Sequence, residues 1–196
     1  MSYILLVLLI TGVVAASLGV ASNAIWTDSQ NVDANVFSTG SIDISTNPTT
    51  QLVTYTSPPM APGDKVTSPI TVTNAGSLQL RYAVTSTTTG DALLAAQLDM
   101  TIWDEAAEGD GGETCTSTPP GTKLYGPADL GATTPGINVI GNPAQGAQGG
   151  ERTLAPSPAY EVLCFQVELP SGTANSFQSK TTTATFAFAA EQTANN

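Results

Sequence analysis

Residues 66–85 have the sequence VTSPITVTNAGSLQLRYAVT, in which two runs of alternating apolar and polar residues flank a turn signal. Such alternation is typical of β-strands with one buried face. Asn74-Ala-Gly-Ser77 supplies residues that favour turns. In the second run we expect Leu78, Leu80, Tyr82 and Val84 to face inward and Gln79, Arg81 and Thr85 to face outward. The segment therefore predicts two consecutive strands.

Strand signals recur on both sides of this segment. The apolar runs end at turn residues such as Asn47-Pro48, Pro58-Pro59 and Pro170-Ser-Gly172, and Met60 to Asp64 predicts a tight turn. Further strands are expected within residues 37–44, 51–55, 100–103, 160–169 and 180–191. With seven or more strands and little helix, the chain is predicted to be an all-β sandwich, jelly-roll or Ig-like.

Two other segments differ from this pattern. Residues 91–98 predict one short helix, with Asp91 as N-cap and Leu94 and Leu98 stacked one turn apart. Residues 121–158 are rich in Gly, Pro, Ala and Gln, which predicts long excursions over the surface.

The last two predicted strands supply a candidate apolar lining. Alternation in residues 160–169 places Cys164 on the face opposite the apolar set, and in residues 180–191 it separates the phenylalanines from Thr183 and Thr185. The residues expected to form an acceptor groove or core are Leu163, Phe165, Val167, Phe186 and Phe188. Trp103 is expected to lie in the core.

Composition excludes several classes of function. The 196 residues carry 16 acidic and 5 basic side chains, a net charge of −11, which disfavours nucleic acid and anionic lipid as partners. The chain contains no histidine, so Ser-His-Asp, Cys-His and HExxH sites cannot be built. We therefore expect a protein that is not an enzyme.

Two cysteines, Cys115 and Cys164, are expected to form a disulfide if the chain is exported. The acidic, Gly-rich run at residues 104–113 lies nearby in sequence. Its spacing matches no EF-hand loop, and runs of charge usually lie in solvent. We expect no cofactor, with a calcium loop as the lesser alternative.

The N-terminus has the features of an export signal. Residues 3–20 are apolar, and Ser22-Asn-Ala24 fits a small-x-small site, which predicts cleavage between Ala24 and Ile25 and a single domain at residues 25–196. The absence of a basic start leaves a retained membrane helix as the alternative. In the main interpretation, the chain meets a membrane only through residues 1–24 before cleavage.

The segment after the signal favours an extended strand that joins a sheet. In residues 25–44 the apolar residues are sparse and separated by short polar ones, without a continuous helical stripe. We predict that residues 25–36 form an N-terminal donor strand anchored by Ile25, Trp26, Val32 and Val36. The alternative is a segment that folds back onto its own sheet.

Several of these segments together resemble the TasA/camelysin family of secreted bacterial and archaeal proteins. The blocks that carry the resemblance are Ile25-Trp-Thr-Asp28, Phe37-Ser-Thr-Gly-Ser-Ile-Asp-Ile44, Pro62-Gly-Asp64, Val72-Thr-Asn-Ala-Gly-Ser-Leu78 and Phe186-Ala-Phe-Ala-Ala-Glu-Gln192. Each block alone is weak evidence for the family, whereas the order and spacing of the blocks make the resemblance specific. Residues 105–158 have no counterpart in the resemblance.

The resemblance implies a jelly-roll subunit of an extracellular biofilm fibre, processed by a dedicated signal peptidase. It implies head-to-tail assembly in which the N-terminal strand of one subunit completes the sheet of the next. The partners would be copies of the same chain, together with accessory fibre proteins. Relatives are also catalogued as metallopeptidases, an activity we do not carry over because the chain has no histidine. The alternative function is a monomeric secreted surface-binding or adhesin module.

Overall fold

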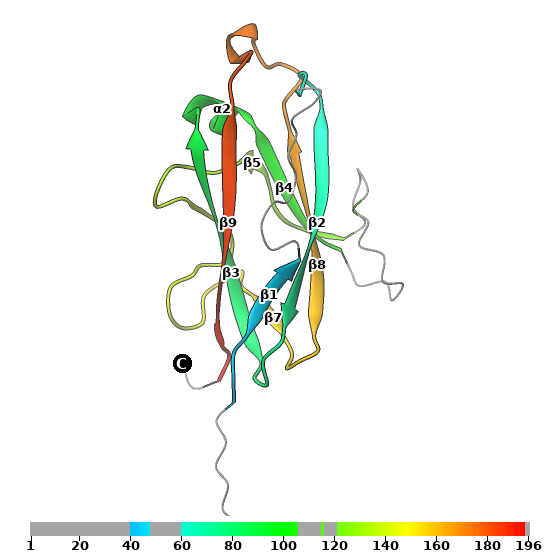
Figure 1. Ribbon diagram of the computed structural model, residues 1–196, viewed down its shortest axis with the longest axis vertical. Coiled ribbons are helices and arrows are strands. Elements are labelled where there is room, and N and C mark those ends of the chain that lie inside the picture. Colours follow the sequence, from blue (N-terminus) through cyan, green and yellow to red (C-terminus); the bar gives the residue numbers. More distant parts are fainter. Residues whose placement is uncertain (1–39, 48–59, 106–114, 116–120, 195–196) are drawn as a thin grey trace, which may run out of the picture. The chain divides into compact units, whose positions relative to one another are not determined.

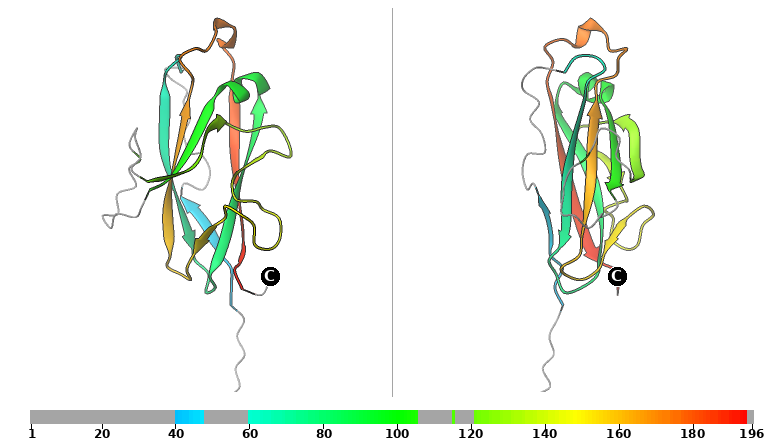
Figure 2. Two further views of the ribbon diagram at one scale, coloured as in Figure 1. Left: turned by 180° about the vertical axis from the view of Figure 1, so that it is seen from behind. Right: turned by 90° about the vertical axis from the view of Figure 1, so that its right-hand side faces the viewer.

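Two antiparallel β-sheets pack face to face and enclose the hydrophobic core (Figures 1 and 2). This arrangement is seen in a computed structural model, which describes residues 40–47, 60–105, 115 and 121–194. The described residues belong to one unit that spans residues 39–196. The predicted all-β sandwich is thus confirmed.

The first sheet, sheet A, has the strand order β1-β2-β8-β4-β5. Its strands are β1 (Ile44–Asn47), β2 (Lys65–Asn74), β8 (Tyr160–Glu168), β4 (Asp99–Glu105) and β5 (Thr122–Asp129). The short β1 pairs with residues 71–74 of β2 alone. Among the described strands, residues 65–70 of β2 therefore pair along one edge only, with β8.

The second sheet, sheet B, is built around β3 (Leu80–Gly90). Strand β9 (Thr182–Gln192) pairs with one edge of β3 along its whole length. The other edge is shared by β6 (Ile137–Ile140) and β7 (Arg152–Leu154). Strand β5, at one side of sheet A, contacts β6, at one side of sheet B. Strand β9 is on the opposite side of sheet B from β6, so it lies over the side of sheet A that carries β1 and β2.

The predicted alternation in residues 66–85 is confirmed. The inward residues Leu80, Tyr82 and Val84 are no more than 1% exposed, and Ile70 and Val72 from β2 join them in the core. The turn between the strands is closed by Asn74, whose side chain accepts from the Gly76 N–H and donates to the Leu78 carbonyl. Burial of one face of each strand fixes the register, since a slip of one residue would expose that face.

The other local predictions in the described residues are largely confirmed. Helix α2 (Ala92–Gln97) begins after Asp91, whose carboxylate accepts from the Leu94 N–H as an N-cap. The tight turn before β2 has Gly63 at a φ of 98°, a value that glycine adopts without steric cost. A 3₁₀ turn, η1 (Asn175–Phe177), lies between β8 and β9.

Two predictions from sequence are wrong. Residues 121–158 contain β5, β6 and β7 rather than surface excursions alone. Trp103 is half-buried and pairs across the sheet with Cys164, on the outer face of sheet A rather than in the core. The outward direction predicted for Arg81 is confirmed, and its side chain is only 7% exposed because the loop at residues 141–151 covers it. Short apolar runs and covering loops leave little periodic signal.

The disulfide predicted between Cys115 and Cys164 is present, with a sulfur–sulfur distance of 1.96 Å. Cys164 is fully buried on the outer face of β8, at the centre of sheet A. The bond therefore ties residue 115 to the middle of the sandwich across 49 positions of sequence.

We expect reduction of the native protein to raise its mass by about 2 Da, one hydrogen for each sulfur. Replacing both cysteines by serine should lower the free energy of unfolding by about 2–4 kcal/mol, because the unfolded chain gains freedom. Urea unfolding of the oxidised, reduced and serine forms measures this. Free thiols in the native protein would contradict the pairing.

Phenylalanines from both sheets meet in the core, with ring centroids 4.8 Å apart between Phe165 and Phe186. Phe165 is 2% exposed and Phe186 is only partly buried. Phe165→Ala should therefore cost about 3–5 kcal/mol of stability, and Phe186→Ala about 1–3 kcal/mol because less apolar surface is lost. Urea unfolding of the dilute protein tests the difference, with the outward Thr185→Ala as control. Equal losses for the two phenylalanines would contradict an open core at β9.

Candidate functional site

Strand β9 is an edge of sheet B with a long stretch of backbone facing outward. Eleven of its residues, Thr182 to Gln192, pair with β3, and no described strand pairs with the opposite edge. An unpaired edge presents a row of N–H and C=O groups that can template another strand. The geometry of β9 therefore suits the addition of an extended segment.

The core under this edge is incompletely covered. The side chains of β9 that point into the sandwich are partly buried, although they pack against the core; they are Ala184, Phe186, Phe188 and Ala190. Their neighbour Tyr82 on β3 is 1% exposed, and its ring lies 6.0 Å from that of Phe188. A strand added at the edge would bury the remaining apolar surface of β9.

Sheet A is also open on this side, at the end where β9 begins. Residues 65–70 of β2 lie beyond the reach of β1. The N–H of Gly63, just before β2, donates to the Leu169 carbonyl, just after β8. The loop after Leu169 leads into β9, so the open parts of β2 and β9 belong to the same end of the sandwich. We call this the helix end, because α2 follows the paired residues Gly90 and Thr182 there.

All five predicted groove residues lie in one core cluster. Leu163 and Phe165 are fully covered, and they form the floor of the core rather than an accessible surface. Val167, Phe186 and Phe188 are partly buried. The structure thus places the phenylalanines of β9 nearest the open edge, and the sequence pattern could not distinguish them from the buried pair.

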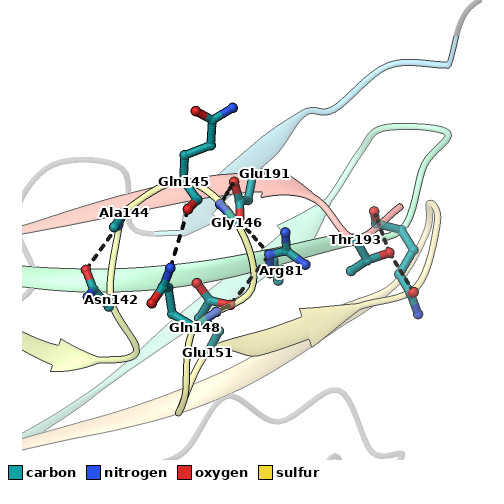
Figure 3. Close-up of polar contacts among 10 residues, drawn as sticks. Arg81, Asn142, Ala144, Gln145, Gly146, Gln148, Glu151, Glu191 and Thr193 are labelled. Atoms are coloured by element: carbon teal, nitrogen blue, oxygen red, sulfur yellow. Dashed lines mark hydrogen bonds and ion pairs between the residues drawn. The ribbon is translucent and has the colours of Figure 1, made fainter. Parts of the chain in front are cut away.

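The opposite end of β9 is held by an ion-pair cluster on the outer face of sheet B (Figure 3). The Nε of Arg81 lies 2.5 Å from Glu191 on β9 and 3.5 Å from Glu151. The two carboxylates also accept backbone N–H groups of the covering loop, Gly146 to Glu191 and Gln148 to Glu151. A cavity of about 160 Å³ lies beneath this loop. The cluster fixes the C-terminal half of β9 and leaves the N-terminal half uncovered by this loop.

A second polar cluster ties the two sheets together inside the sandwich. Arg152 of β7 donates to Glu161 at 2.5 Å and also pairs with Asp104, while the Tyr82 hydroxyl donates to Glu161 at 2.6 Å. Burial, followed by the Glu161 charge, raises the pKa of Tyr82 well above its usual value. Burial alone would lower the pKa of Arg152, but Glu161 and Asp104 outweigh it and raise that pKa. This network is a structural element that joins β3, β4, β7 and β8.

The described residues contain no group of three or more His, Cys, Asp or Glu side chains able to hold a metal ion. The acidic run at residues 104–113 lies outside the described residues beyond β4, and the calcium alternative stays a prediction. No helix within the described ranges is long and apolar enough to cross a membrane. The signal segment, the Ala24–Ile25 site and the donor residues Ile25, Trp26, Val32 and Val36 lie outside them.

The fold defines a disulfide-linked β-sandwich protein in which one edge of β9 has no partner among the described strands. Residues 5–97 match the family described as camelysin metallo-endopeptidase, which confirms the resemblance to the TasA/camelysin family. No curated protein matches the sequence. The family match indicates an extracellular protein. The term metallo-endopeptidase is part of the family's description and is not a property observed for this chain.

We expect Arg152→Leu to destabilise the protein by about 2–4 kcal/mol, since Glu161 and Asp104 would be left without their shared cation. Removing Lys65, whose pair with Glu168 is more exposed, should cost at most about 1 kcal/mol. Thermal and urea unfolding of Arg152→Leu and Lys65→Ala provide the comparison. Similar small losses for both would show that the buried network contributes little.

Proposed function

We propose that this chain is the structural subunit of an extracellular filament, assembled head to tail by donor-strand exchange. Residues 25–36 of one copy would add to the outer edge of β9 in the next. The observation that carries the proposal is the unpaired edge of β9 with core-facing phenylalanines that are only partly buried. A head-to-tail contact that does not close on itself produces a filament.

The donor and the edge match in length. Residues 25–36 are 12 residues, and β9 has 11 residues. Because alternate residues of a strand share a face, Trp26, Val32 and Val36 would all point toward the core when the donor pairs. Main-chain hydrogen bonds would supply affinity, and these side chains would supply specificity.

The direction of the chain favours donation between subunits over folding back. Ser41 lies at the β2–β3 hairpin, where its N–H donates to Ser77, and the end of β9 lies there too, with the Thr193 N–H donating to Gln79. We call this the hairpin end. A segment folding back from there would run parallel to β9, whereas a donor arriving from another subunit at the helix end would run antiparallel. Every named strand pair in the described residues is antiparallel, a pairing slightly more stable per residue than parallel.

The proposal extends to processing, partners and chemistry. The chain would be exported, cleaved after Ala24 and retained at the cell surface or in a biofilm matrix, with copies of itself and accessory fibre proteins as partners. It would act without catalysis or a bound cofactor. Its lack of histidine supports this, because a conventional zinc peptidase site needs histidine ligands.

We expect the protein lacking residues 25–36 to stay folded and monomeric, because the acceptor edge remains while the donor is gone. A synthetic peptide of residues 25–36 should bind this truncated protein and raise its melting temperature by mass action. Light scattering and thermal melting with and without peptide measure both effects. Filaments formed without residues 25–36 would rule out this donor, and a stable monomer of the full mature chain would favour the surface-binding alternative.

Within the donor, Val32→Asp should weaken the joint by several kcal/mol, about the cost of burying an unpaired carboxylate in an apolar site. Asn31→Asp adds the same charge on the opposite face of the strand and serves as the matched control. Peptides carrying each change can be titrated against the truncated protein. Equal affinities would show that Val32 does not face the acceptor core.

A further inference from the structure

Large apolar side chains are exposed at the two ends of the sandwich. Within the described residues the exposed large hydrophobic side chains are Leu93 at 68%, Tyr160 at 50% and Ile42 at 39%. Leu93 is on α2 at the helix end, where Leu94 and Ala95 of the same helix turn toward the core. The Leu93 side chain thus takes no part in packing α2 against the core.

Ile42 and Tyr160 lie at the hairpin end. Ile42 is next to Gly76 of the β2–β3 turn, since a Cβ at Gly76 would lie 3.1 Å from the Ile42 Cα. Tyr160 begins β8, and its register partner is Thr73, just before the same turn. Leu93 is thus separated from both residues by the length of the strands (Figure 1).

The spacing of the donor brings the two ends together. If residues 25–36 occupy the β9 edge of a neighbour, only residues 37–39 remain between the donor and Gly40, the first described residue. Three extended residues span about 10 Å. A linker this short holds the hairpin end of the donating subunit against the helix end of the accepting subunit.

We propose that Leu93 of the accepting subunit packs against Ile42 and Tyr160 of the donating subunit, and that this end-to-end contact is a second part of the filament joint. This inference rests on the proposed donor-strand exchange. The occupant of each surface is a second copy of the same chain, and the contact is heterologous, because different residues of the two copies meet. The contact removes the exposed apolar side chains of both ends from water.

The contact separates two properties of the joint. The donor strand alone determines how tightly a free peptide of residues 25–36 binds, whereas the end-to-end contact acts only when whole subunits assemble. Changes at Leu93 or Tyr160 should therefore alter the critical concentration for filaments and leave peptide binding to the truncated protein unchanged.

The test uses the mature chain with Leu93→Lys, Tyr160→Glu or both, and Ala147→Glu on the exposed loop over sheet B as control. Each single change should raise the critical concentration about tenfold, with unchanged melting of the monomer. The double variant should recover part of the loss, because lysine and glutamate would then meet across the joint. The control should assemble normally.

Unchanged critical concentrations in both single variants would overturn the end-to-end contact, and so would losses without recovery in the double variant. Neither outcome affects the donor strand, which is tested by the assembly of the chain lacking residues 25–36 and by the binding of the free peptide. The two proposals are therefore tested by separate measurements.

Discussion

The one-sided pairing of β9 is the constraint on which the arrangement of this molecule depends. Its inner edge is satisfied by β3 over eleven residues, and its apolar face closes the core through Phe186 and Phe188. Backbone groups and apolar surface on the same strand are left for another segment to cover. A monomer with such an edge risks uncontrolled association, and a specific strand that occupies the edge removes that risk.

The sandwich combines this open side with two rigid clusters elsewhere. Arg81 anchors the end of β9 to the loop over sheet B, and Arg152 joins strands of both sheets inside the fold. The Cys115–Cys164 bond fastens residue 115 to the centre of sheet A. These contacts hold the sandwich in one geometry, which would lower the entropy cost of adding a strand at the β9 edge.

The sequence predicted the parts of the fold that have strong periodicity. Alternation specified β2, β3, β8 and β9 with their inward faces, and Asp91 indicated the start of the helix. It failed for β5, where Gly126-Pro127 gives a turn signal, and for β6 and β7, whose four and three residues are too few to establish a period of two. The outward direction of Arg81 was predicted, whereas its burial was not, because that burial depends on a loop some sixty residues away, which local patterns do not encode. Periodicity also identified the inward phenylalanines Phe186 and Phe188. That their strand, β9, lies at the edge of sheet B follows from the topology alone.

The placement of both arginines inside ion pairs has a consequence for the exterior. The two clusters combine two arginines with four carboxylates, and the other twelve acidic and three basic residues leave a net charge of −9 on the rest of the chain. A filament of such subunits would behave as an anionic polyelectrolyte. Neighbouring filaments would repel one another until salt shortens the Debye length to about 10 Å, near 0.1 M ionic strength. The ionic composition of the surroundings would thus control whether filaments lie apart or gather into bundles.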